Sequence, residues 1–158
     1  MIDVTEQSIE RPVKGQKLYY SGKKKNHTIK AQILVCLNTG IILSVICMKG
    51  KQHDFSIFKS SNILIHPDSE LLADSGYQGI NKYHENSIIP IKKKGITRTI
   101  ETKTHNRTLS KRRVLIENIN RLCKIFRSVK EIYRGKHKNY GLIWRLVAAL
   151  VNLRTRSI

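Results

Sequence analysis

The order of patterned segments predicts an α/β domain, in which a mixed sheet is flanked by helices. Three observations support this prediction. The first half of the chain holds short segments rich in Ile, Leu and Val, separated by turn residues. The second half holds long segments whose apolar residues recur at helical spacing. The 158 residues fit a single domain, 1–158, that is large enough to bury a sizeable core.

The predicted strands begin at the N-terminus. Residues 1–9 alternate weakly and predict a first strand. Residues 28–37 and 41–48 predict an antiparallel hairpin, because the turn signal Asn38-Thr39-Gly40 lies between two apolar runs.

Shorter elements follow the hairpin. Asp54 stands where an N-cap is expected, ahead of a short helix over 55–61. The apolar run 71–73 predicts a buried strand that ends at the turn Asp74-Ser75-Gly76. Two further elements are expected, one or two helical turns over 80–86 and a strand over 87–91 that Pro90 confines to an edge.

A long amphipathic helix is predicted over 111–126, which lacks Gly and Pro and which Ser110 is expected to cap. Its apolar stripe consists of Leu115, Ile119, Leu122 and Phe126. Arg113, Glu117 and Lys124 fall within about 40° of one another on this helix, roughly opposite that stripe. One carboxylate between two cations is consistent with part of a catalytic site. The ordinary alternative is a salt bridge on a solvated helix face. A final amphipathic helix is expected over 140–154.

The charge balance points to a polyanionic partner. Lys and Arg number 30 against 11 Asp and Glu, a net charge of +19, so nucleic acid is the expected partner. The 40% hydrophobic content indicates a folded domain rather than a disordered basic tail. Three cysteines without a CxxC pair are typical of reduced thiols. Residues 1–12 are too polar for a signal peptide and 142–153 too short for a membrane span, so we expect a cytoplasmic protein that does not bind a membrane.

Two basic runs are candidates for phosphate contacts. Lys23-Lys24-Lys25 precedes the hairpin, and Lys92-Lys93-Lys94 opens a loop that is expected to reach about Asn106. Phosphate contacts by such runs are independent of DNA sequence and weaken with salt. The ordinary alternative for both runs is a solvated loop.

Three carboxylates stand out by position: Asp3 in the first strand, Asp74 after a buried strand and Glu117 in the long helix. Carboxylates at strand ends of an open α/β sheet project toward the crevice where ligands bind. Their oxygens suit Mg²⁺ or Mn²⁺, and two such ions would promote an in-line phosphodiester displacement. Taken singly, each residue also has an ordinary explanation: Asp3 lies near a chain terminus, Asp74 in a turn and Glu117 in a salt bridge.

Five motifs follow one another along nearly the whole chain. They are Met-Ile-Asp3-Val-Thr-Glu6-Gln-Ser-Ile-Glu-Arg11-Pro12, Tyr20-Ser21-Gly22-Lys23-Lys24-Lys25-Asn26-His27-Thr28-Ile29-Lys30, His53-Asp54-Phe55, Leu72-Ala73-Asp74-Ser75-Gly76-Tyr77-Gln78-Gly79 and Arg113-Val-Leu-Ile-Glu117-Asn-Ile-Asn-Arg-Leu-Cys-Lys124. In this order they resemble the bacterial insertion-sequence DDE transposases. The last motif matches the R-x3-E-x6-K part of that family's Y-x2-R-x3-E-x6-K signature.

The resemblance implies an RNase H-like fold with Asp3, Asp74 and Glu117 as the acidic triad that holds two Mg²⁺ or Mn²⁺ ions. Arg113 and Lys124 would then contact phosphates or the transposon end. In this family a metal-dependent hydrolysis at the element's end frees a 3′-OH, which then attacks target DNA. The implied partner is DNA, as transposon ends and target, and a homodimer is left open.

The chain departs from the family pattern at two points. Ser110 occupies the position of the signature Tyr. Family members carry an N-terminal helix-turn-helix region, whereas this chain starts just before Asp3, so we expect a truncated or split reading frame. Two alternatives stay open: a catalytically inactive basic DNA-binding remnant, and an RNase H-type nuclease that hydrolyses without joining.

Overall fold

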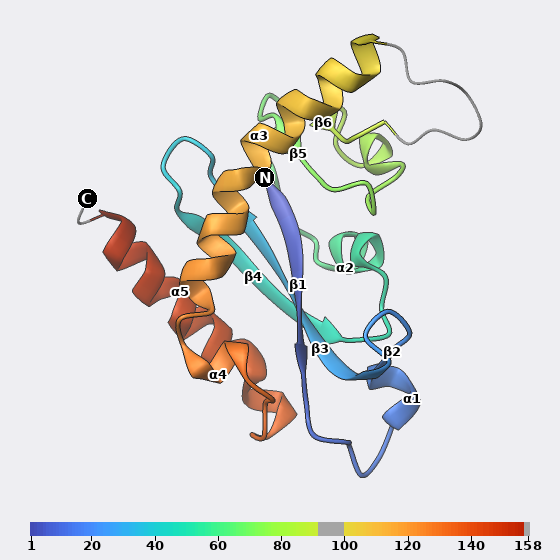
Figure 1. Cartoon of the computed structure of the whole chain (residues 1–158), viewed down its shortest axis with the longest axis vertical. Helices are drawn as coiled ribbons and strands as arrows, with labels where there is room; N and C mark the ends of the chain where they lie inside the picture. The colour runs from blue at the N-terminus through green and yellow to red at the C-terminus, as the bar shows by residue number, and fades with distance from the viewer. Residues whose placement is uncertain (92–99, 157–158) are drawn as a thin grey trace.

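An antiparallel sheet forms around one long central strand (Figure 1). The computed structural model describes residues 1–91 and 100–156. Strand β3 (Asn26–Val35) pairs along its length with β1 (Ile2–Ser8) and with β4 (Ile42–Lys49). The start of β3 also pairs with β2 (Tyr20–Ser21). The predicted first strand and hairpin are therefore confirmed.

A second, smaller sheet consists of two parallel strands, β5 (Leu71–Leu72) and β6 (Ser87–Ile88). The 3₁₀ helix η1 (Ile80–Lys82) lies between them in the chain, and helix α2 (Asp54–Ser60) precedes them. The α/β class is confirmed. Among the described residues, however, the parallel pair forms its own sheet instead of extending the larger one into a single mixed sheet.

Two long helices follow in the C-terminal half, α3 (Ile100–Cys123) and α5 (Tyr140–Arg156). The shorter helices are α1 (Gln16–Tyr19), α4 (Arg127–Lys130) and the 3₁₀ helix η2 (His137–Asn139). Within residues 1–91 and 100–156, no helix has the length and apolar character needed to cross a membrane.

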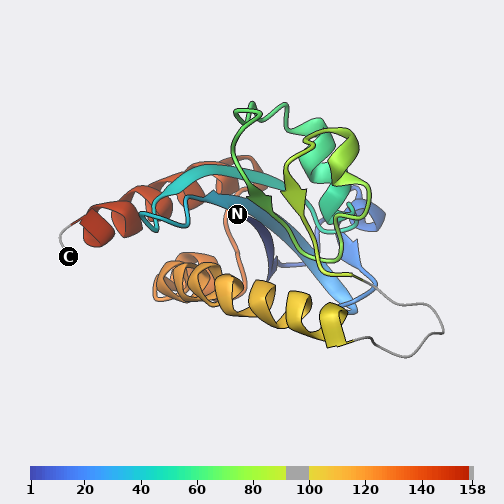
Figure 2. The same ribbon diagram turned by 90° about the horizontal axis from the view of Figure 1, so that it is seen from above.

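The larger sheet separates two apolar cores, because successive strand residues point to opposite faces. Ile33 packs in the core shared with α3 and α5, which includes the fully buried Trp144. Leu34 packs in the core shared with α2 and β5, together with its cross-strand partner Ile2. Figure 2 shows α3 on one side of the sheet and α2, β5 and β6 on the other. Since Ile2 faces the second core, its neighbour Asp3 faces α3.

Helix α3 differs from its prediction. It begins at Ile100 rather than at 111, so the predicted loop up to Asn106 is wrong for residues 100–106. Ser110 lies inside the helix, where its hydroxyl donates to the carbonyl of Asn106 at 2.9 Å, so its predicted capping role is also wrong. The side-chain amide of Asn106 in turn bonds both the N–H and the C=O of Ile91, at 3.0 and 3.2 Å. These two bonds connect the N-terminal part of α3 to the chain just after β6.

Candidate active site

Asp3 on β1 points toward α3 and meets a polar side chain there. The Asn120 amide donates to Oδ2 of Asp3 at 2.8 Å. Burial raises the pKa of Asp3, and the nearby positive charge of Arg113 opposes this rise. Asp3 is therefore a partly desolvated carboxylate whose charge is stabilised chiefly from α3.

Asp74 belongs to the same site, although it comes from the turn after β5. Its Oδ1 lies 3.6 Å from Nη1 of Arg113 and also accepts from the backbone N–H of Ser75. The charge of Asp74 further raises the pKa of Asp3, so the two carboxylates repel each other. Arg113 offsets this repulsion, because its guanidinium interacts with both.

Glu117 is exposed on α3. Together with Asp3, Asn120 and Lys124 it lines an open groove of about 580 Å³. The buried face of α3 is formed by Leu109, Ile116, Ile119, Asn120 and Cys123, whereas the predicted stripe residues Leu115 and Leu122 are only half-buried. At 100° per residue, this face is turned by about 80° from the predicted stripe toward Glu117. Glu117 therefore reaches the groove from the flank of the helix.

Two of the three predicted carboxylates, Asp3 and Asp74, are arranged in a way that suits a divalent cation. Within the described residues, no three His, Cys, Asp or Glu side chains are grouped closely enough to hold a metal ion. Asp3 and Asp74 nevertheless interact electrostatically, and the raised pKa of Asp3 indicates a carboxylate that additional positive charge would stabilise. Oxygen donors of this kind suit Mg²⁺ or Mn²⁺.

The predicted DNA-binding cations lie in different places. Arg113 is engaged with Asp74, and Lys124 lines the groove. Lys23-Lys24-Lys25 is exposed on the turn between β2 and β3. Lys92-Lys93-Lys94 lies outside the described residues. The structure therefore brings Arg113 and Lys124, but not the first basic run, to the acidic residues.

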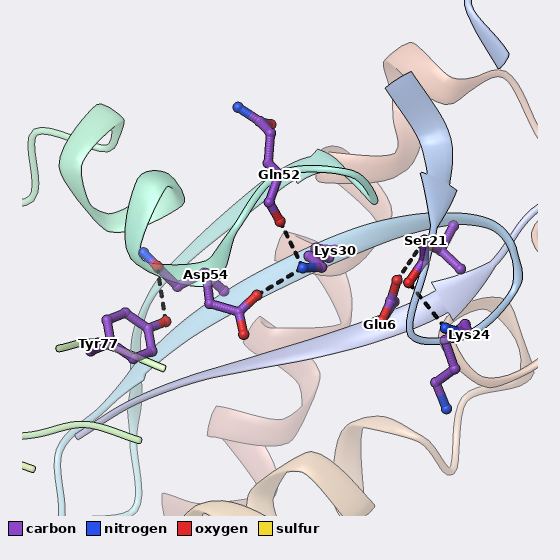
Figure 3. Close-up of polar contacts among 9 residues, drawn as sticks. Glu6, Ser21, Lys24, Lys30, Gln52, Asp54 and Tyr77 are labelled. Carbon is purple, nitrogen blue, oxygen red and sulfur yellow. Dashed lines mark hydrogen bonds and ion pairs between the residues drawn. The ribbon is translucent and has the colours of Figure 1, made fainter. Parts of the chain in front are cut away.

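A polar network that includes Lys30, Asp54 and Tyr77 lies on the face of the sheet opposite Asp3 (Figure 3). Lys30 donates to the carbonyl of Gln52 at 2.6 Å and to Asp54 at 2.9 Å. Asp54 is the first residue of α2, with His53 at the N-cap position, so the predicted capping role of Asp54 is wrong. Tyr77 is buried, and its hydroxyl donates to Gln32 at 3.3 Å.

One residue of the site was not singled out from the sequence. Asn120 bonds Asp3, and its only signal was a polar residue within the helical pattern, one turn after Glu117. Lys30, on the opposite face of the sheet, belongs to the second family motif, but nothing in the sequence indicated that it would bond Asp54.

Known proteins resemble this chain over nearly its whole length. The chain matches, over residues 2–152, a family model described as DDE superfamily endonuclease. It is 42% identical over 153 residues to a Microchaete diplosiphon protein named "Probable transposase for insertion sequence element IS702". The match covers 96% of this chain but 55% of that relative, so the chain spans about half the length of the curated relative. No solved structure matches the chain significantly.

Proposed function

Because this chain belongs to the DDE superfamily of endonucleases and to its insertion-sequence transposases, we propose that it forms the catalytic part of a DNA transposase. The family indicated by the five sequence motifs is thus confirmed, and transposases act on DNA. The reaction, the site residues and the metal stoichiometry are our proposals. The observations that carry them are that Arg113 lies beside Asp74 and interacts with Asp3, and that Asp3 and Glu117 line one groove.

We assign the three carboxylates to a divalent-cation site. Endonucleases of this family generally use divalent metal ions. Asp3 and Asp74 would hold the cation, and Glu117 would complete the set from the wall of the groove. A bound cation activates the attacking oxygen and stabilises the leaving oxygen of a phosphodiester. Two ions, Mg²⁺ or Mn²⁺, are the number we propose.

The remaining side chains position the carboxylates and the DNA. Asn120 fixes the orientation of Asp3 through its hydrogen bond. Arg113 neutralises part of the charge of the carboxylate pair, and a cation held there would leave it available to contact a phosphate. Lys124 lines the same groove and offers a further phosphate contact. The exposed Lys23-Lys24-Lys25 turn, and Lys92-Lys93-Lys94, would bind the backbone outside the groove.

The proposed reaction has two steps. Water attacks a phosphorus at the element's end, and the P–O3′ bond breaks to leave a 3′-OH and a 5′-phosphate. The freed 3′-OH then attacks a phosphorus of target DNA, a new P–O3′ bond forms, and the target strand leaves with its own 3′-OH. No covalent enzyme intermediate is needed.

The substitution Asp74→Asn tests the proposal. We expect it to lower Mn²⁺-dependent cleavage of an element-end duplex by roughly 10³-fold, the scale of losing one electrostatic group at a reacting centre, while DNA binding is kept. Asp68→Asn is the matched control, since that side chain is 92% exposed outside the groove. Cleavage of the element-end duplex is measured on gels, and joining with a labelled 3′-OH end.

Each contrary outcome favours a specific alternative. Equal cleavage by Asp74→Asn and the wild type would remove Asp74 from the reaction. Binding without any cleavage in the wild type, with tighter binding by Asp74→Asn, would indicate a non-catalytic DNA-binding protein. Cleavage without joining would indicate a nuclease of the RNase H type.

A further inference from the structure

A second pocket lies where the end of β4 meets the start of α5. Its volume is about 920 Å³, within the range of pockets that hold small ligands. None of the residues that line it lines the groove of Asp3 and Glu117. Ile29, Val45 and Cys47 contribute apolar side chains from the sheet. The pocket is therefore separate from the proposed active site.

The charged side chains of this pocket are all basic. They are Lys49, Lys51, Lys138 and Arg145, and His137 lies beside them. No Asp or Glu lines the pocket, and within the described residues none of these four cations pairs with a carboxylate. Unpaired cations around an apolar floor favour a ligand that is anionic and carries an apolar part.

Two aromatic rings at the pocket favour a flat apolar part. The rings of Tyr19 and His137 lie with their centroids 4.9 Å apart and their planes at 49°. Nζ of Lys49 lies 5.8 Å from the centroid of Tyr19. Tyr19 is held in place because the backbone N–H of Lys51 donates to the carbonyl of Leu18. Both rings are only half-buried, so part of each can contact a ligand.

We propose that this pocket binds an unpaired nucleotide of a DNA strand. The base contacts the rings of Tyr19 and His137, and the flanking phosphates contact Lys49, Lys51 and Arg145. An unpaired nucleotide fits better than a duplex, because a paired base exposes only its edges whereas stacking on a side chain needs a free ring face. The choice of DNA as the nucleic acid rests on the proposed function, but binding in the pocket does not need the acidic groove.

Fluorescence anisotropy with a labelled single-stranded oligothymidylate, in EDTA, tests the inference. Tyr19→Leu should weaken binding roughly 5- to 100-fold, the effect of losing one aromatic on which a base stacks. Leucine keeps an apolar side chain against the core that Tyr19 partly contacts. A strand of the same length without bases should bind Tyr19→Leu and the wild type equally. Lys49→Gln combined with Lys51→Gln should weaken binding of both strands.

The adjacent tyrosine provides the matched control. Tyr20 is 46% exposed, and its ring contacts His27 outside the pocket. Tyr20→Leu should bind the oligothymidylate like the wild type. Equal affinities of Tyr19→Leu and Tyr20→Leu would overturn the inference.

A second measurement, on the wild type, tests the pocket even if the Tyr19→Leu variant does not fold. A strand with 5-iodouracil is photo-cross-linked to the wild type and mapped by mass spectrometry. A cross-link at Tyr19 or His137 supports the pocket, and cross-links confined to other residues overturn it. Asp68→Asn should keep its affinity for the single strand. Because the titrations are done in EDTA and need no cleavage, absence of cleavage in the wild type would contradict the proposed function and leave the pocket standing.

Discussion

At the scale of single residues, the ionisation of Asp3 is the most informative property of the candidate site. Its environment contains two opposing effects: burial raises its pKa, and the charge of Arg113 lowers it. Burial is the larger effect, and the negative charge of Asp74 adds to it. The site therefore holds a carboxylate that is less stable in its charged form than a carboxylate in water.

This environment predicts the pH dependence of stability. Because the pKa of Asp3 is raised on folding, its ionisation destabilises the fold as the pH rises from about the ordinary value of 3.8 through the folded pKa. Asp3→Asn should therefore melt at a higher temperature than the wild type at pH 7. The difference should vanish below pH 3.8. Thermal unfolding in EDTA, followed by circular dichroism, measures both.

Asp68→Asn is the control for this prediction and should melt like the wild type at both pH values. Adding Mn²⁺ should raise the melting temperature of the wild type more than that of Asp3→Asn, because a cation stabilises only the form that binds it. A lower melting temperature of Asp3→Asn at pH 7 in EDTA would contradict the assigned burial effect.

At the scale of elements, helix α3 shows where sequence patterns succeed and where they fail. The stripe of Arg113, Glu117 and Lys124 was predictable, because it depends only on helical spacing. The N-terminal part of α3 was not, because its Thr and Asn residues are poor helix formers. It is helical because Leu109 is buried in the core shared with the sheet and because Asn106 bonds the backbone of Ile91, and both contacts depend on residues distant in sequence.

The same distinction applies to the site. Asp74 was identifiable from its local position after an apolar run, and Asp3 mainly from the family motif in which it stands. The bond from Asn120 to Asp3 joins residues 117 positions apart, so the sequence alone carried no trace of it. Lys30 and Asp54 likewise meet only because β3 passes beneath the start of α2.

The Lys30–Asp54 contact predicts that Lys30 stabilises the folded chain by anchoring the start of α2. The Lys30 side chain is 14% exposed and holds both the Gln52 carbonyl and Asp54, so Lys30→Met should lower the free energy of unfolding by about 1–2 kcal/mol. Lys82→Met, an exposed lysine on η1, should change it by less than about 0.5 kcal/mol. Urea unfolding measures both. Equal stabilities of the two variants would show that the contact does not anchor α2.

At the scale of the whole molecule, the three proposed active-site carboxylates lie in a strongly basic chain. The net charge of +19 attracts DNA from any direction, whereas Asp3, Asp74 and Glu117 repel its phosphates locally. Arg113 reduces this repulsion at Asp74, and three further cations line the groove with Asp3 and Glu117, namely Arg121, Lys124 and Lys130. Binding should therefore depend on the many cations inside and outside the groove, and the proposed catalysis on the three carboxylates.

This division predicts how salt acts on binding. Replacing Lys23, Lys24 and Lys25 together by Gln should reduce the slope of log K against log salt concentration by about 0.9 for each lysine that contacts a phosphate of duplex DNA. Asp74→Asn removes a repulsive charge and no phosphate contact, so it should leave the slope unchanged. Anisotropy titrations of a duplex over a range of salt concentrations measure both slopes. An unchanged slope in the triple variant would mean that the exposed β2–β3 turn is only solvated, and that DNA is held by other basic residues.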